Sequence, residues 1–289
     1  MSNVSIKDML EAGAHFGHQT RRWNPKMRPF IYGAKNGVHI INLGKTARLF
    51  RDATNFISRT TARGDQVLFV ATKRQAREIV REEASRVGMP VVDHRWLGGT
   101  LTNFKTVRTS IEKLAEMEQK LAPEMAARLP KKEVAMLRKA HEKLERNLGG
   151  LRNMPRMPGA VFVVDPVQEH IAIAEARRLK IPVIALIDTN GDPDVVDYPI
   201  PANDDAMRSI RLFVGGAADA CMAGVAAGKA AFAKDFDGVV GVAAADTSKV
   251  DVVVKPSRKV DEEVVAEAVE AVEAVEAVEA TEATEDEQA

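Results

Sequence analysis

The chain has very little cysteine and few aromatic side chains. Its 289 residues include one cysteine, Cys221, two tryptophans and two tyrosines. A single cysteine excludes an intramolecular disulfide framework, which favours a reducing compartment. The N-terminus lacks the apolar core of a signal sequence, and no apolar run approaches membrane-spanning length. We therefore expect a cytoplasmic protein without membrane contact, in which Cys221 is a small packing residue of a helix.

The sequence signatures of common nucleotide-dependent and nucleophilic enzymes are absent as well. No Gly-x-Gly-x-x-Gly follows a predicted strand, and there is no Gly-x-Ser-x-Gly turn. The stretch from Gly44 to Thr46 resembles the end of a phosphate-binding loop. However, the position five residues earlier, which needs a glycine, is His39. These absences predict that the chain is not an enzyme and needs no cofactor.

Lysine and arginine are absent from the C-terminal segment. Residues 261–289 contain twelve carboxylates and no Lys or Arg. The whole chain has 41 cations and 41 anions, so residues 1–260 carry 41 against 29, a net charge of +12. A basic body indicates a polyanionic partner. The C-terminal Glu-Ala-Val repeat turns about 300° per step on a helix and builds no apolar face. We expect residues 233–289 to form a disordered acidic tail.

Strands and helices alternate through most of the remaining chain. Continuous apolar runs predict strands covered on both faces, at residues 66–71, 91–93, 160–164 and 182–187. Helical periodicity predicts helices at residues 46–60, 74–87, 169–179 and 204–232. Shorter strands are predicted at residues 38–43, after the turn Asn36-Gly37, and at an edge, residues 198–200. This pattern predicts a three-layer α/β domain with a parallel sheet, formed by residues 37–104 and 149–232.

Residues 105–148 interrupt this alternation. Apolar residues recur at steps of three and four from Ile111 to Met125 and from Val134 to Leu148, with Pro130 between the runs. The pattern predicts an antiparallel helical hairpin, a short coiled coil, inserted into the α/β domain. It carries eleven cations and seven anions. The hairpin is therefore a candidate contact surface, with a solvated projection as the alternative.

Four cations surround one tryptophan within residues 11–33. Within residues 1–36 we expect a short helix capped by Ser5, followed by an irregular basic arm, because Pro25 and Pro29 forbid a continuous helix. Cations neutralise phosphates, and an indole ring packs on a sugar or a base. The predicted RNA contacts of the arm are Arg21, Arg22, Trp23, Lys26 and Arg28. The alternative is an ordinary surface loop with solvated charges.

A second unusual stretch, residues 94–103, follows a predicted strand end and turns on Gly98 and Gly99. Such a flexible backbone can approach a phosphate closely. The predicted RNA contacts in this loop and at the base of the hairpin are Arg95, Trp96, Lys105 and Arg108. For Trp96, a place in the core is an alternative of equal weight.

Several acidic residues fall in loops after the predicted strands, where α/β folds place ligands. A divalent metal is one possible ligand, held by His18, Asp188, Asp204 and Asp205. In the alternative interpretation, the aspartates close turns and Asp204 caps a helix.

Three stretches in a fixed order point to a known family: EAGAHFGH at residues 11–18, HRWLGG at 94–99 and DTN at 188–190. With them, about residues 3–230 of the chain resemble bacterial ribosomal protein two of the small subunit. The resemblance implies a flavodoxin-like parallel sheet with an inserted helical hairpin and a structural role in the small ribosomal subunit. It also implies contact with small-subunit ribosomal RNA, not DNA, and with other small-subunit proteins. These include the messenger-binding ribosomal protein one, whose docking it assists. No catalysis is implied.

Two other interpretations stay open. An enzyme on a doubly wound sheet would use the loops at Asp188 and Asp204 for a metal and a phosphate, and would turn over a nucleotide. A protein–protein adaptor would bind its partner through the hairpin. In that case, deletion of residues 111–148 removes the partner and leaves RNA binding intact.

Overall fold

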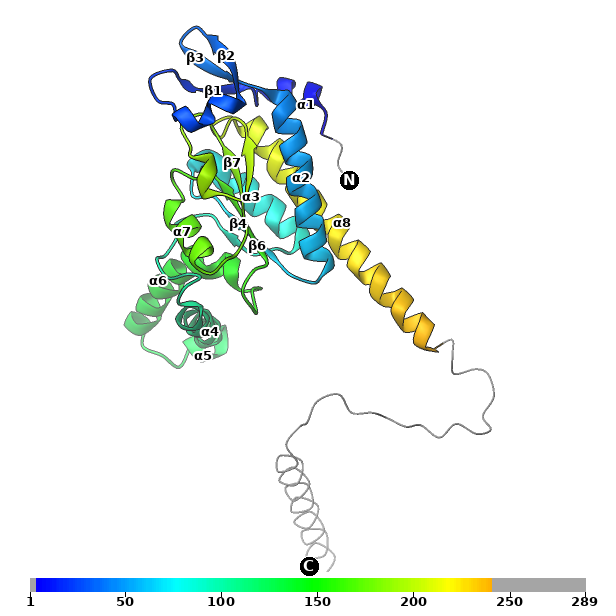
Figure 1. The fold of residues 1–289 in the computed structure, drawn as a ribbon. Helices are drawn as coiled ribbons and strands as arrows, with labels where there is room; N and C mark the ends of the chain where they lie inside the picture. The colour runs from blue at the N-terminus through cyan, green and yellow to red at the C-terminus, as the bar shows by residue number, and fades with distance from the viewer. Residues whose placement is uncertain (1–3, 241–289) are drawn as a thin grey trace, which may run out of the picture. The chain divides into compact units, whose positions relative to one another are not determined.

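The computed structural model describes residues 4–240, except for the side chains of residues 124, 126 and 231–240. Its main sheet has five parallel strands in the order β5-β4-β6-β7-β8. Helices surround this sheet (Figure 1). The strands are β4 (Val67–Val70), β5 (Val91–Val92), β6 (Ala160–Val164), β7 (Val183–Ile187) and β8 (Tyr198–Pro201). The predicted parallel sheet and its short edge strand are therefore confirmed.

Helices cover both faces of this sheet. One face packs against α2 (Leu43–Ala62), α3 (Arg74–Val87) and α8 (Met207–Val240), and the other against α7 (His170–Arg178). In β4, Val67 and Phe69 belong to the first core cluster, while Leu68 and Val70 belong to the second. Successive strand residues point to opposite faces, so a strand that is buried on both faces must be apolar throughout. This alternation produces the predicted three layers.

The strand order fits a flavodoxin-like fold. In chain order, the first strand of the sheet, β4, lies between β5 and β6, and β7 and β8 follow on one side. The connections therefore leave in opposite directions on the two sides of β4. In open α/β sheets, ligands bind at the carboxyl ends of the strands beside this reversal.

The N-terminal arm is more regular than predicted. It forms a second, antiparallel sheet of β1 (Phe16–Gln19), β3 (Val38–Ile41) and β2 (Ile31–Lys35), in that order. A 3₁₀ helix, η1 (Pro25–Phe30), connects β1 to β2. The prolines do exclude a long helix, but Pro25 occupies the first position of η1, where no N–H is needed. The expectation of an irregular arm is thus corrected.

The turn at Asn36-Gly37 is confirmed, but it joins two strands of the small sheet. Both residues have positive φ, 53° and 74°, as a two-residue hairpin of β2 and β3 requires. The predicted strand after the turn, β3, pairs with β1 and β2 and does not join the main sheet. The proposed division between residues 36 and 37 therefore falls within this hairpin. Before the arm, Ser5 caps α1 (Ile6–Glu11) with a capping box, as predicted.

Residues 104–151 are mostly helical. They form α4 (Phe104–Leu121), the short α5 (Pro123–Ala126), α6 (Lys131–Leu148) and η2 (Gly149–Leu151). The helix α4 packs against α6, and the fully buried side chains of the pair are few, notably Leu114 and Leu148. That these helices form a separate inserted hairpin stays a prediction.

The last helix is longer than predicted. It begins at Met207, not Asp204, and runs to Val240, beyond the expected end at residue 232. Residues Met207–Ala230 are long and apolar enough to cross a membrane by length and composition, which corrects the expectation that no such run exists. Half of the most apolar window of this helix is buried inside the described part of the protein. The remaining residues of the proposed acidic tail, 241–289, lie outside the described residues.

A 3₁₀ helix, η3 (Pro193–Val195), links β7 to β8.

The one cysteine, Cys221, is fully buried in α8, as expected for a packing residue. Its surroundings raise the pKa of the thiol to about 12, because burial disfavours the thiolate.

Candidate nucleic-acid interface and the carboxylate cluster

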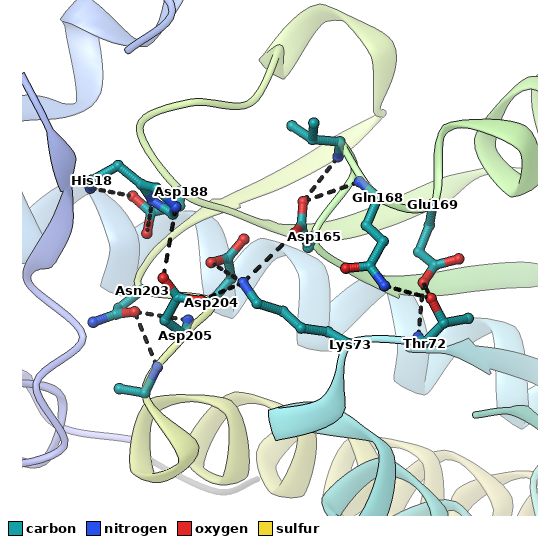
Figure 2. Close-up of polar contacts among 12 residues, drawn as sticks. His18, Thr72, Lys73, Asp165, Gln168, Glu169, Asp188, Asn203, Asp204 and Asp205 are labelled. Carbon is teal, nitrogen blue, oxygen red and sulfur yellow. Dashed lines mark hydrogen bonds and ion pairs between the residues drawn. The ribbon is translucent and has the colours of Figure 1, made fainter. Parts of the chain in front are cut away.

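Charged side chains meet at the carboxyl ends of the parallel strands (Figure 2). Lys73 follows β4, Asp165 follows β6, Asp188 follows β7, and Asp204 and Asp205 follow β8. The Lys73 Nζ atom lies 2.8 Å from Asp204 Oδ1, 2.7 Å from Asp205 Oδ1 and 3.6 Å from Asp165 Oδ2. These residues are far apart in sequence and meet because parallel strands end at one edge. Together with His18 they are called the carboxylate cluster below.

The strand β1 reaches this cluster because Gly17 has no side chain. A Cβ atom at Gly17 would lie 2.6 Å from Thr189 Cγ2 and 3.0 Å from Asp188 Oδ1. The next residue, His18, donates its backbone N–H to Thr189 Oγ1 (2.9 Å) and Asp188 Oδ1 (3.2 Å). Its ring atoms Nδ1 and Nε2 lie 2.8 Å from Asp188 Oδ2 and 3.6 Å from Asp205 Oδ2. The 2.8 Å contact is not aligned as a hydrogen bond and is an ion pair when His18 is protonated.

Close packing of these charges shifts their pKa values. Burial, together with the negative charges of Asp165 and Asp188, raises the pKa of Asp204 to about 7. The contact with Asp188 raises the pKa of His18, and Asp204 and Asp205 add to this effect against the opposing influence of burial. Burial works to lower the pKa of Lys73, but the carboxylates around it raise the value overall. Lys73 is therefore a permanent cation at the centre of the cluster.

The donor set of the cluster fits a divalent metal. One ligand atom each from His18, Asp188 and Asp204 lies within 4.8 Å of the others, and Asp205 is in contact with His18. The Asp204 Oδ2 atom is buried and accepts no hydrogen bond from the described residues. Imidazole nitrogen with carboxylate oxygen suits several divalent cations. The structure thus brings the four predicted residues together, and metal binding itself stays a prediction.

The alternative role suggested for Asp204, capping a helix, is wrong. The turn before α8 is closed by Asn203, whose Oδ1 accepts hydrogen bonds from the backbone N–H groups of Asp205 (2.9 Å) and Ala206 (3.1 Å). The carboxylate of Asp204 instead faces Lys73. Directly after β6, Asp165 has a φ of 64°, a left-handed conformation that non-glycine residues adopt rarely and that often accompanies functional sites.

The predicted cations of the arm are all exposed, but they differ in whether they form ion pairs. Arg21, Arg22 and Arg28 are exposed and form no ion pair with any other residue that the structure describes. Lys26 is exposed as well, but its Nζ lies 2.8 Å from both Asp192 Oδ2 and Asp194 Oδ2. These carboxylates raise the pKa of Lys26, the hydrogen bond to Asp192 contributing most. Lys26 therefore fastens η1 to the loop after β7.

A buried side chain and a backbone hydrogen bond hold the arm against the main domain. Met27 is fully buried between the cations on either side of it and belongs to a core cluster of the main sheet. Asn24 donates its backbone N–H to the carbonyl of Thr189 (2.8 Å). Trp23 is half-buried, with its ring centroid 5.2 Å from that of His39. Part of this indole is therefore accessible to a ligand.

The loop of residues 94–103 is organised by one buried carboxylate, that of Glu175 on α7. Its Oε1 accepts hydrogen bonds from Trp96 Nε1 (3.0 Å) and Gly99 N (2.7 Å). Its Oε2 accepts from Leu101 N (3.0 Å), Thr102 N (3.0 Å) and Thr102 Oγ1 (3.1 Å). Burial favours the neutral acid, but these donors together lower the pKa of Glu175 below its ordinary value.

Trp96 must be withdrawn as a predicted RNA contact. Its side chain is 7% exposed and belongs to the core cluster that also contains Met27. An indole in this position cannot stack on a base, because the apolar ring already packs inside the protein and its N–H is bound by Glu175. The neighbouring Arg95 is exposed. The alternative of equal weight, a core tryptophan, is therefore the correct one.

The predicted contacts form two groups. The arm group lies beside the carboxyl end of β7, to which Asn24 is bonded, whereas Lys105 and Arg108 are exposed on the first turns of α4. In Figure 1 the small sheet and the helices α4–α6 lie at opposite ends of the main sheet. The structure therefore does not gather all nine predicted residues on one surface.

Sequence reasoning missed two residues that organise these sites. Lys73 lies three residues after the end of the apolar strand β4, and a cation in the loop after a buried strand is a signal that could have found it. Glu175 has no comparable signal, because a carboxylate within an amphipathic helix is ordinarily solvated. Its role depends on a loop more than seventy residues away in the chain.

The fold and the site first define a class of protein: a flavodoxin-like α/β protein whose ligand-binding edge is filled by its own lysine and carboxylates, with exposed arginines beside it. The comparisons with known proteins are more specific. A family model described as "Ribosomal protein S2" matches residues 9–224. The chain therefore belongs to the ribosomal protein S2 family.

Similar proteins carry the name "Small ribosomal subunit protein uS2". The one from Syntrophobacter fumaroxidans is 54% identical over 224 residues, which are 78% of this chain and 82% of the relative. The relative from Sorangium cellulosum is 56% identical over 221 residues, 76% of this chain and 80% of its own length. The one from Solidesulfovibrio magneticus is 53% identical over 229 residues, 79% and 89% of the two chains. As a ribosomal protein, the chain is a structural component of translation and not an enzyme, which removes the enzyme alternative.

Proposed function

We propose that the chain is a constituent of the small ribosomal subunit, in the cytoplasm, and that it binds the ribosomal RNA of that subunit through the exposed cations of its arm. The observation that carries this proposal is the contrast within the arm. Lys26 is neutralised by two aspartates, whereas Arg21, Arg22 and Arg28 have no ion-pair partner among the described residues. Arginines held on a buried anchor, with a half-exposed indole beside them, suit phosphates and a sugar or base.

A second group of contacts extends this interface. Arg95 and Lys105 are exposed without an ion-pair partner in the described part of the chain. Arg108 pairs only with Glu112, at 3.4 Å, and both side chains are exposed. Such a surface pair contributes little to stability and is readily exchanged for a phosphate. Glu175 acts here by fixing the loop that carries Arg95.

Salt dependence of RNA binding tests the arm. An arm variant, R21Q/R22Q/R28Q, is compared with a control variant, R74Q/R178Q/R208Q, which removes three arginines that are also exposed and unpaired among the described residues. Each lost phosphate contact lowers the slope of log K against log salt by about 0.7–0.9. We expect the arm variant to lose about two to three units of slope and the control less than one. Equal slopes for the two variants would contradict the role of the arm.

Docking of the messenger-binding ribosomal protein one is the second part of the proposal. The helices α4 and α6 offer the surface for it, since most of their side chains are exposed. Deletion of residues 111–148 should abolish co-sedimentation of that protein with subunits that contain the shortened chain. If the shortened chain retains the partner but loses RNA, the hairpin binds RNA and not the protein.

We also propose that the carboxylate cluster binds one divalent metal ion. The buried Asp204 Oδ2 atom without a hydrogen-bond partner among the described residues supports this. Metal analysis of the purified chain and of the His18→Ala variant tests it. We expect close to one equivalent of metal in the unmodified chain and a large loss in the variant. Absence of metal from both would contradict it.

A further inference from the structure

The helix α2 carries a row of exposed cations that the proposed interface does not use. The exposed cations of this row, called the α2 ridge below, are Lys45, Arg48, Arg51, Arg59 and the C-cap residue Arg63; one exposed carboxylate, Asp52, lies among them. At 3.6 residues per turn they lie within about 120° of the helix circumference. The buried residues of α2, among them Phe50, Ala53 and Ile57, lie on the opposite side. The ridge is therefore one continuous, solvent-facing surface.

Ion pairing does not explain the ridge. None of its five cations forms a salt bridge with a residue in the part of the chain that the structure describes, and the helix contains one carboxylate, Asp52. Other helices interleave their charges. In α3, Arg81 pairs with Asp93 and Arg86 with Glu83. In α6, Arg146 pairs with Glu142.

Helix stability does not explain the ridge either. Lys45 lies in the first turn of α2, where the helix dipole disfavours a cation, and no acidic residue offsets it there. Lys45 and Arg48, and Arg48 and Arg51, are three residues apart, a spacing at which like charges repel across the helix surface. Arg59, in the last turn, is favoured by the helix dipole, and Lys45 donates a hydrogen bond to Pro29, but neither effect offsets the repulsion among Lys45, Arg48 and Arg51. An anionic partner is the simplest physical reason for these three cations.

The ridge continues from the arm. Lys45 donates a hydrogen bond from Nζ to the carbonyl of Pro29, and Asn42 donates its backbone N–H to the carbonyl of Phe30 (2.9 Å). The first cation of the ridge thus lies beside η1, which carries Arg28. From Lys45 to Arg63 the helix rises about 27 Å, at about 1.5 Å per residue. A row of this length can follow a polynucleotide backbone over several phosphates.

We propose that the α2 ridge is a second RNA-binding surface, which takes the phosphodiester backbone of a strand that first contacts the arm. This rests on the proposed function, because it assumes that the arm binds ribosomal RNA. The contacts are to phosphates, so they add affinity and salt dependence but no sequence selectivity. Arginine suits this role because its planar group donates two parallel hydrogen bonds to a phosphate.

A ridge variant of the full chain, R48Q/R51Q/R59Q, tests the proposal against the control variant R74Q/R178Q/R208Q, which has the same net charge. The probe is a small-subunit ribosomal RNA transcript, titrated from 50 to 300 mM salt. We expect the slope of log K against log salt to fall by about two to three units in the ridge variant. Its affinity at 150 mM salt should fall about tenfold or more. The control should lose less than one unit. Glutamine keeps helix propensity, and thermal unfolding verifies that both variants are folded.

The possible outcomes distinguish failure of the ridge proposal from failure of the proposed RNA-binding function of the arm. If the unmodified chain shows no salt-dependent affinity for the transcript, the proposed function fails. If the arm variant loses slope while the ridge variant equals the control, the ridge proposal alone is overturned. A ridge variant that keeps full RNA affinity but loses affinity for a polyglutamate probe would overturn it too, because it would assign the ridge to an acidic protein.

Discussion

A single carboxylate, that of Glu175, holds a loop of the candidate interface in place. We predict that Glu175→Gln lowers the free energy of unfolding by about 2–4 kcal/mol at pH 7, because an amide cannot accept at both positions and buried donors lose a charged partner. The pKa of Glu175 is lowered in the folded protein. Its contribution is therefore present above the unfolded pKa, about 4.3, and is lost as pH falls through the lower folded value. Urea denaturation between pH 3 and 8 measures this.

Glu169→Gln is the matched control for that experiment. Glu169 is also buried and accepts hydrogen bonds from Thr72 N (2.8 Å) and Thr72 Oγ1 (2.5 Å). Burial raises its pKa, so its contribution is largest below the unfolded pKa and is lost as pH rises through the folded value. The losses in free energy of unfolding caused by Glu175→Gln and Glu169→Gln should therefore change with pH in opposite directions. Parallel pH profiles would show that the hydrogen bonds to Glu175 do not favour its ionised form.

Lys73 is the internal counterion of the carboxylate cluster. We predict that Lys73→Met destabilises the chain by about 3–5 kcal/mol at neutral pH, because Asp165, Asp204 and Asp205 lose their shared cation. Loss of Lys73 removes a charge that lowers the pKa of Asp204 from a still higher value to about 7. The cost should therefore shrink as pH falls toward about 7 and change little through Asp204 below it. Denaturation in the presence of a chelator measures both effects. The double variant K73M/D204N should recover part of the loss, and a purely additive result would contradict the interaction.

At the scale of elements, α8 packs against α2 through glycines. A Cβ atom at Gly224 would clash with Ser58 O and Thr61 Oγ1, and one at Gly228 would lie 2.5 Å from Ala62 O. We predict that Gly224→Ala destabilises the chain by about 1–3 kcal/mol, because the helices must move apart. Thermal unfolding with calorimetry measures the change.

The control for the helix contact lies in the same helix. At Gly215 an added Cβ meets nothing closer than Glu83 Cδ, at 3.9 Å. Gly215→Ala should therefore stabilise the chain by up to about 1 kcal/mol, through helix propensity alone. Equal effects of the two substitutions would mean that α8 does not pack closely on α2.

Strands and helices with a clear apolar pattern could be predicted from the sequence. Strands that form only by pairing with another strand could not. The strands β4, β6 and β7 are apolar throughout, so their identity and their parallel arrangement follow from composition and spacing. The arm has no such pattern. The turn at Asn36-Gly37 joins β2 to β3, but β1 is a strand because it pairs with β3, more than ten residues away in the chain. Such pairing leaves little trace in a local pattern.

For the whole molecule, charge is divided between a basic body and an acidic C-terminal segment. Residues 1–260 carry a net charge of +12 and the full chain a net charge of zero. We predict that a chain ending at Val260 binds ribosomal RNA more tightly than the full chain at 10–50 mM salt. The difference should vanish at higher salt, as the Debye length falls from about 30 Å at 0.01 M to about 8 Å at 0.15 M.

A full-length chain with every carboxylate of residues 261–289 replaced by its amide separates charge from length. It should bind RNA as the shortened chain does, in filter-binding or anisotropy titrations. If it behaves as the unmodified chain instead, the segment acts through its length and not through its charge.

The layered α/β class, the basic body and the absence of an enzyme signature follow from the order of amino acids alone, because each depends on composition or on a local period. The sequence also placed His18 and three aspartates as possible neighbours, since strand ends share one edge of a parallel sheet. Only the tertiary structure decided that Trp96 lies in the core, that Lys26 is neutralised and that Lys73 stands among the carboxylates. Burial and pairing of a side chain depend on residues distant in the chain, which no local pattern records.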